Sequence, residues 1–308
     1  MAADASTPDG DVTFVSHAHG DHLYQNAPEN VICSRATSAL AAHRRPDEAR
    51  PTRVEPDGVE LIDSGHVVGS RAVCIEHDDV RVLYTGDVST RDRFFLNGFD
   101  PVEADVLVIE STYGTPEYEF APQGELEAAL EDFIEETSDS PILLFGYTLG
   151  RAQELQMIAD GVVNGTLYVS EAIHRMGEVI SRFLERSLPG ERYEPETVLE
   201  PGDVLILPSQ TNRLAFVDRL TEQTGAIRVG ASGWAIDDSY KYRADLDETF
   251  VLSDHCDFPE LMSIVEDVDP EVVYTQHGFA DEFAREITAR TGIRSVSLKP
   301  NQQTLDDF

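Results

Sequence analysis

Short apolar segments separated by turn residues dominate the first third of the chain. Their pattern predicts one helix, at 34–43, and strands at 12–15, 59–62, 72–76, 80–85 and 106–109. Strands of four to eight residues bounded by turn formers are typical of a β-sandwich layer. The region up to Glu110 is therefore expected to be rich in β-structure.

The hydrophobic period changes after residue 113. Leu126, Leu130, Phe133 and Ile134 recur at helical spacing. Strands that alternate with further helices are expected at 142–145, 167–169, 204–207 and 227–229. Alternating strands and helices predict a parallel sheet.

The last part of the chain returns to mixed elements. Strands are expected at 249–253, 272–275 and 295–298, and helices after Phe258 and at 282–290. Together the three regions predict an α/β protein in which one domain interrupts another. The expected limits are 1–116 and 243–308 for the outer domain and 117–242 for the inserted one.

Residues 16–22 read Ser-His-Ala-His-Gly-Asp-His and follow an apolar strand. Neutral His and ionised Asp are ordinary ligands of Zn²⁺ and similar divalent ions. A solvated polar loop is the alternative interpretation. Four ligand-capable groups within six positions favour a metal site.

Further candidate ligands lie downstream. His66 stands between glycines, Asp87 follows the strand at 80–85, and His277 follows the strand at 272–275. Taken singly, an Asp or His at a strand end is more often a capping or turn-forming residue than a metal ligand. Because loops at strand ends carry catalytic groups on a rigid scaffold, their recurrence with the heptad predicts one shared site.

These motifs resemble those of the metallo-β-lactamase fold, and specifically of its nucleic-acid-cleaving β-CASP branch, over nearly the whole chain. Two further marks of the branch are present in order: Glu110 at a strand end and His255 in Ser-Asp-His-Cys-Asp. The resemblance implies a metallo-β-lactamase αββα sandwich with an inserted Rossmann-like domain. It also implies two divalent metals, with Zn²⁺ preferred and Mn²⁺ as the alternative.

The same resemblance assigns roles to the candidate residues. One ion would be held by His17, His19 and His66, the other by Asp21, His22 and His277, and Asp87 would bridge them. The catalytic set would be Asp87, with His255 as proton donor to the leaving oxygen and Glu110 holding its tautomer. Asp4 matches an early Asp that orients the ligand loop from outside the metal shell. Since family members carry strands ahead of that Asp, Met1 is expected to be an internal start.

Four residues of the inserted domain are candidates for substrate binding. Arg151 and Gln153 open a helix after a strand, where the β-CASP branch has Gly-Arg-x-Gln; a surface Arg that caps a helix is the alternative. Ser232 and Gly233 end the last strand of the insert, and the adjacent Trp234 either stacks on a base or packs in the protein.

Composition and charge indicate the salt conditions and the cellular location in which the protein is expected to work. The 308 residues carry a net charge of −35, with acids spread along the chain, as in proteins of halophilic organisms. Because molar salt weakens phosphate electrostatics for every protein, this charge does not exclude nucleic acid. No segment reaches the ~18 to 20 apolar residues of a membrane span, and the start is acidic, so a cytoplasmic protein with no membrane partner is expected.

Three classes of function compete. The first is a β-CASP nuclease of single-stranded RNA or DNA, with exo or endo mode open. His277 favours RNA, whereas the segments after Ala231 and Phe250 also resemble ligase-associated DNA exonucleases. A hydrolase of small thioesters or lactones and a non-catalytic partner subunit are the other classes; a homodimer is a further expected assembly.

Overall fold

The structure is a computed structural model that describes residues 1–184 and 186–298. The chain divides into two compact units. Unit 1 comprises Met1–Asp92, Leu96–Glu119 and the segment from His255 onward, and unit 2 comprises Arg93–Phe95 and Phe120–Asp254. Each unit has its own sheets and its own hydrophobic core.

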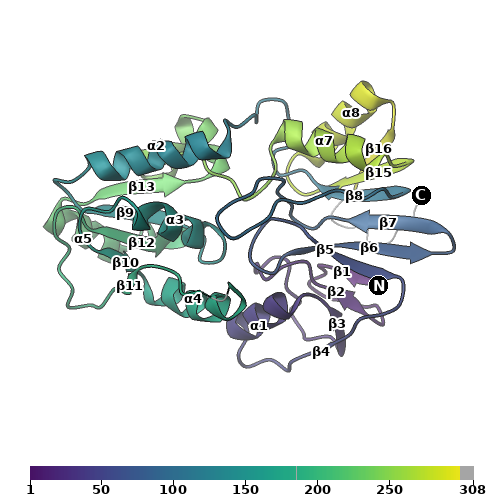
Figure 1. The fold of residues 1–308 in the computed structure, drawn as a ribbon, viewed down its shortest axis with the longest axis horizontal. Helices are drawn as coiled ribbons and strands as arrows, with labels where there is room; N and C mark the ends of the chain where they lie inside the picture. Colours follow the sequence, from purple (N-terminus) through teal and green to yellow (C-terminus); the bar gives the residue numbers. More distant parts are fainter. Residues whose placement is uncertain (185, 299–308) are drawn as a thin grey trace. The chain divides into compact units, whose positions relative to one another are not determined.

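Unit 1 contains two sheets (Figure 1). The smaller is parallel and runs β1 (Ala2–Ala3), β2 (Thr13–Phe14), β3 (Asn30–Ile32), β4 (Thr52–Arg53). The larger is mixed and runs β16 (Arg294–Ser297), β15 (Val272–Gln276), β8 (Val106–Glu110), β7 (Val80–Tyr84), β6 (Arg71–His77), β5 (Val59–Asp63).

Three helices complete the layers of unit 1. They are α1 (Arg35–Arg44), α7 (Phe258–Val268) and α8 (Ala280–Thr291). Phe14 and Ile32 of the small sheet pack against one face of the large sheet, while α7 and α8 pack against its other face. Val31 points oppositely to Ile32 and packs with α1. The resulting order is helix, sheet, sheet, helices.

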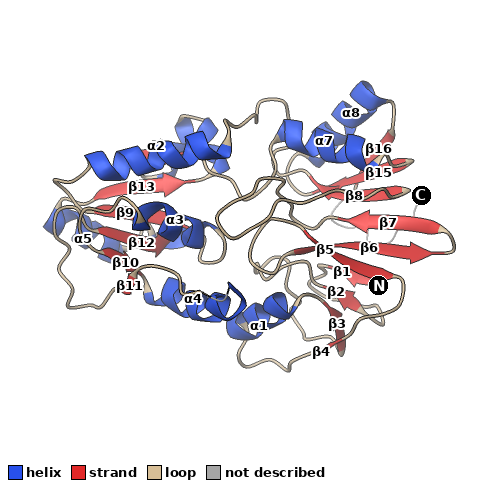
Figure 2. Cartoon of the chain, viewed as in Figure 1, coloured by secondary structure: helices blue, strands red, loops and turns tan. Residues whose placement is uncertain are grey.

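Unit 2 is built on one wholly parallel sheet (Figure 2). Its strand order is β11 (Glu191–Arg192), β10 (Leu167–Val169), β12 (Val204–Pro208), β9 (Ile142–Gly146), β13 (Ile227–Ala231), β14 (Glu248–Phe250). Its helices are α2 (Gln123–Glu136), α3 (Arg151–Asp160), α4 (Glu171–Leu184), α5 (Ala215–Thr224) and α6 (Ser239–Ala244).

Alternate residues of the central strands of unit 2 face opposite layers. Ile142 and Leu144 pack with α2 and α3, whereas Leu143 and Phe145 pack with α5. Because both faces are covered, β9 is apolar at every position except its terminal glycine rather than alternating. The predicted fold class, an αββα sandwich with a Rossmann-like parallel-sheet unit, is confirmed.

One strand differs from the expectation. The strand predicted at 249–253 is β14, Glu248–Phe250, and it pairs in parallel with β13 of unit 2 rather than with the large sheet of unit 1. Helix α6 and the 3-10 helix Gly233–Ile236 lie between β13 and β14 in sequence, so the two strands form one more crossover unit. Within the described residues, none of the helices is both long and apolar enough to cross a membrane.

Candidate metal centre

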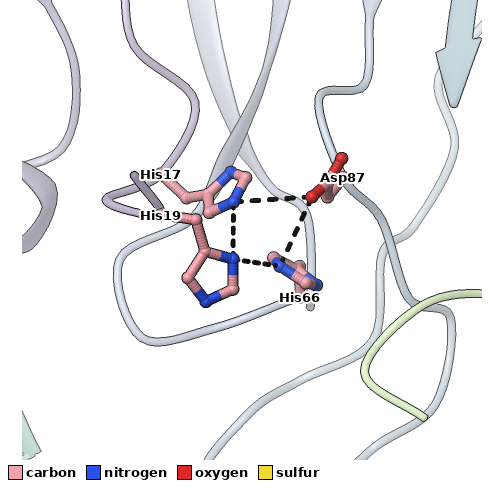
Figure 3. A group of neighbouring side chains, drawn as sticks. All are labelled: His17, His19, His66 and Asp87. Carbon is pink, nitrogen blue, oxygen red and sulfur yellow. Dashed lines mark hydrogen bonds and ion pairs between the residues drawn. The ribbon is translucent and has the colours of Figure 1, made fainter. Parts of the chain in front are cut away.

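Four side chains of unit 1 converge on one point (Figure 3). His17 Nε2 lies 3.0 Å from His19 Nδ1, which lies 3.2 Å from His66 Nε2. Asp87 Oδ2 closes the ring at 3.5 Å from His17 Nε2 and 3.6 Å from His66 Nε2. His17 and His66 are fully buried and Asp87 is nearly so.

The donor set and its spacing suit a divalent ion. Bonds of about 2.0–2.1 Å in a tetrahedral site place ligand atoms about 3.3 Å apart. The four measured separations, from 3.0 to 3.6 Å, bracket that value. Burial, followed by the charges of neighbouring imidazoles, holds the pKa of His17 well below its ordinary value, so this ring is neutral and offers a lone pair. This cluster can hold a metal ion.

Asp4 is hydrogen-bonded to His22 of the heptad directly and is linked to His17 through Ser16. Its Oδ2 accepts hydrogen bonds from His22 Nδ1 at 3.0 Å and from the Ser16 hydroxyl at 2.6 Å. The Ser16 oxygen lies 3.0 Å from His17 Nδ1 and accepts its proton. Since His17 then carries its proton on Nδ1, it presents a bare Nε2 toward Asp87, and His22 would do the same once its Nε2 proton is lost. The predicted role of Asp4 stays a prediction, and Ser16 joins the same network.

We expect Asp4→Asn to lower metal affinity by about 10- to 100-fold, as is typical of changes to groups that orient ligands. The amide has one acceptor oxygen, so it cannot accept both the Ser16 N–H at Oδ1 and the Tyr84, Ser16 hydroxyl and His22 protons at Oδ2. Competition with a metal chelator measures the affinity. Asp11→Asn, an exposed neighbour, is the control. Equal affinities for the two variants would refute the orienting role.

The second predicted set is less compact. His22 Nε2 lies 3.4 Å from Asp87 Oδ2, so one carboxylate oxygen faces three imidazoles. The ring of His277 lies 5.5 Å from that of His22, centroid to centroid. Asp21 and His277 are exposed, but the charges of His22, His19 and His277 act on Asp21 and hold its pKa below the ordinary value although burial raises it. Asp21 and His277 therefore lie at the outer side of the cluster.

Burial would lower the pKa of His22, but the charge of Asp87 and then that of Asp4 outweigh it and raise the pKa to about 10. The imidazole must lose a proton before it can bind a metal cation, so binding of a cation at His22 would release a proton. Burial raises the pKa of Asp87, which a bound cation would counteract.

The loop that carries His277 is held in a left-handed conformation. His277 has φ 61° and Gly278 has φ 51°. The Ser111 hydroxyl donates to the carbonyl oxygens of Gln276 and His277, at 2.9 and 2.6 Å, and the Ser111 carbonyl accepts from Phe279 N. Backbone strain of this kind is kept only where the surroundings enforce it.

Gly278→Ala is expected to destabilise the protein more than Gly292→Ala. Both glycines have positive φ, which costs an L-residue about 1 kcal/mol. A Cβ at Gly292 meets open space, whereas at Gly278 it collides with the Ser111 carbonyl and the Thr112 backbone, which adds about 1–3 kcal/mol. Denaturant unfolding measures both free energies. Equal losses would show that the 276–279 loop is not tightly held.

His255 and Glu110 form a pair beside the cluster. His255 Nδ1 lies 2.7 Å from Glu110 Oε1, and the His255 ring lies 4.5 Å from that of His66, centroid to centroid, with the two planes tilted by 51°. Glu110 is fully buried and also accepts from the Val88 and Thr112 backbone N–H groups, at 2.9 and 3.1 Å. Burial would raise the pKa of Glu110, but the charge and hydrogen bond of His255 outweigh it and lower that pKa. An ionised Glu110 thus holds the His255 proton on Nδ1.

Three of the four candidates in unit 2 have polar partners within that unit, and the fourth is buried. Arg151 is buried and forms ion pairs with Glu154 and, at 3.2 Å, with Asp254. The Gln153 side chain accepts from Gly150 N and so caps α3. Ser232 accepts from Trp234 N, and Gly233 is buried. Substrate binding by these four residues stays a prediction.

Several contributors were not identified from the sequence. Ser16 contacts His17 and Asp4, Tyr84 donates to Asp4, and Ser111 donates to the His277 carbonyl. The signal for Ser16 and Ser111 was their position next to His17 and Glu110. No sequence signal pointed to Tyr84, because its partner Asp4 is 80 positions away.

Comparisons of the sequence with known proteins found several relatives. A probable DNA ligase of Opitutus terrae is 34% identical over 304 residues, which cover 94% of this chain and 29% of that protein. An RNase J-like protein of Methanocaldococcus jannaschii is 32% identical over 55% of this chain and 39% of its own. Endoribonuclease YSH1 of Saccharomyces cerevisiae is 36% identical over 35% of this chain and 14% of its own. The chain thus spans well under half the length of these relatives.

A crystal structure of a protein of unknown function from Enterococcus faecalis V583 shares the fold, with a TM-score of 0.63 over 95% of this chain and 80% of that one, at 16% identity. No family model matches the sequence. With its layered fold, its histidine cluster and these relatives, the chain is similar to the metallo-β-lactamase-fold β-CASP nucleases.

Proposed function

We propose that the protein is a metal-dependent phosphodiesterase that cleaves single-stranded nucleic acid with two divalent ions. The observation that carries the proposal is the convergence of His17, His19, His66 and Asp87 on one point next to His255. A small-molecule hydrolase would use the same cluster but has no need of the His255–Glu110 pair. The names of the relatives, among them nucleases and endoribonucleases, support the choice.

The residues divide into two ligand sets in this proposal. The first ion would be held by His17, His19 and His66, and the second by Asp21, His22 and His277. Asp87 would be shared by both sets, which is consistent with its Oδ2 facing His17, His22 and His66 at 3.4–3.6 Å. Zn²⁺ is the preferred ion because imidazoles dominate the set, and Mn²⁺ is the alternative.

Bound divalent ions would polarise the scissile phosphate and lower the pKa of a water molecule. His255 holds a proton on Nε2 when charged and transfers it to the leaving oxygen, while Glu110 keeps the Nδ1 proton in place. Asp4 and Ser16 keep His17 and His22 oriented throughout. The inserted domain, expected at 117–242, would contribute Arg151, Gln153, Ser232 and Gly233 to substrate binding.

RNA is the proposed substrate, supported by His277 and by the relatives named endoribonuclease. DNA is the second candidate, because the relative matched over 94% of this chain is named a probable DNA ligase. The experiment uses end-labelled single-stranded RNA and DNA of the same sequence, at high salt, with Zn²⁺ or Mn²⁺. Faster cleavage of RNA supports the proposal, and cleavage of DNA alone selects the second candidate.

The same assay tests the other classes. Metal binding without cleavage of either strand would indicate a hydrolase of small molecules. Absence of both metal binding and cleavage would indicate a non-catalytic subunit. Product sizes over time separate exonucleolytic from endonucleolytic cleavage.

A further inference from the structure

Arg91 connects the loop after β7 to the start of α7 within unit 1. Its Nε donates to Glu260 Oε1 at 2.6 Å, and one terminal nitrogen donates to Asp257 Oδ2 at 3.0 Å. The Arg91 side chain is 11% exposed and that of Asp257 only 3%. Since burying these charges is costly without good geometry, the arrangement indicates a specific role rather than a chance surface pair.

The carboxylates of Asp257 and Glu260 also cap the N-terminal end of α7. Asp257 Oδ1 accepts from Glu260 N at 3.0 Å, and Glu260 Oε2 accepts from Asp257 N at 2.9 Å, which is a capping box. Each carboxylate therefore uses one oxygen for the helix and the other for Arg91. A planar guanidinium can span both acceptors, whereas an ammonium group acts as a single point charge.

This clamp lies next to His255 in sequence and in space. Cys256 N donates to the Val88 carbonyl at 2.9 Å, and Val88 N donates to Glu110 Oε1, which also accepts from His255. Val88 and Arg91 thus contact Cys256, Asp257 and Glu260, which directly follow His255. The loop that carries Asp87 and the segment that carries His255 are held as one piece.

We infer that Arg91 is a positioning residue, which sets His255 relative to Asp87 by holding the capping box of α7. The inference rests on the proposed function. Because the Arg91 side chain donates to Asp257 and Glu260, its effect on turnover is expected to pass through the 255–260 segment.

The test compares Arg91→Lys and Arg91→Gln with the parent on single-stranded RNA and DNA. We expect kcat to fall by roughly 10- to 100-fold, the effect of a small misplacement of a reacting group, while KM and bound metal stay unchanged. Arg91→Lys keeps the charge and is expected to retain more activity than Arg91→Gln. Arg45→Gln removes a similar partly buried pair with Glu48 at the end of α1 and is the control.

A second comparison separates positioning from general stability. In a His255→Ala background, Arg91→Lys is expected to cause no further loss of kcat, because the group that it positions is gone. A further tenfold loss of kcat when Arg91→Lys is added to His255→Ala would overturn the inference. Parental kcat in both Arg91→Lys and Arg91→Gln would also overturn it. Failure of the parent itself to cleave either strand would instead overturn the proposed function.

Discussion

Replacing Asp87 by alanine is expected to abolish cleavage and to reduce the metal bound by the protein. One oxygen of Asp87 faces His17, His22 and His66 at 3.4–3.6 Å, so its removal affects both proposed ions. Metal catalysis is worth several kcal/mol, and about 1.4 kcal/mol is a tenfold change, so kcat should fall about 10³-fold or more. Single-turnover cleavage and metal analysis measure the two effects.

Glu76→Ala, which removes an exposed carboxylate from β6 of the same sheet, is the control for the loss of one negative charge. It is expected to retain parental activity and metal. If Asp87→Ala kept both ions and most of its turnover, Asp87 would not be a bridging ligand.

His255→Ala is expected to separate catalysis from metal binding. His255 lies beside His66 and joins two other groups that could hold an ion, but it belongs to neither proposed ligand set, so the variant is expected to retain its metal. Loss of a general acid typically costs about 10²- to 10⁴-fold in rate. A substrate with a leaving group that needs no proton should recover much of the lost rate.

His77→Ala is the matched control, because His77 lies at an exposed hairpin turn. Parental turnover by His255→Ala would show that another group supplies the proton. Loss of metal by that variant would instead assign His255 to the ligands.

Much of the fold could be predicted from the sequence because many of its strands are buried and apolar. The apolar run of β9 and the turn-bounded strands β6 to β8 carry strong local patterns. The strands β1, β4 and β11 have two residues each, which is too short for any period to be seen. The pairing of β14 with β13 depends on tertiary contacts rather than on local sequence.

The candidate site was readable only in part. The residue types of the heptad identified the ligand chemistry, but not that His17, His19, His66 and Asp87 converge while Asp21 and His277 stay exposed. The Arg91 clamp was not identified, because 166 positions separate Arg91 from Asp257 and neither has a motif of its own. Long-range pairs of this kind leave no periodic signal in one sequence.

The number of divalent ions bound per chain tests the central claim most directly. The purified protein is dialysed against Zn²⁺ or Mn²⁺ in high-salt buffer and its metal content is measured by mass spectrometry, with Asp87→Ala alongside. The account predicts two ions per chain for the parent and a clear loss for the variant. A parent that binds no ion, or the same metal content in both proteins, would contradict it.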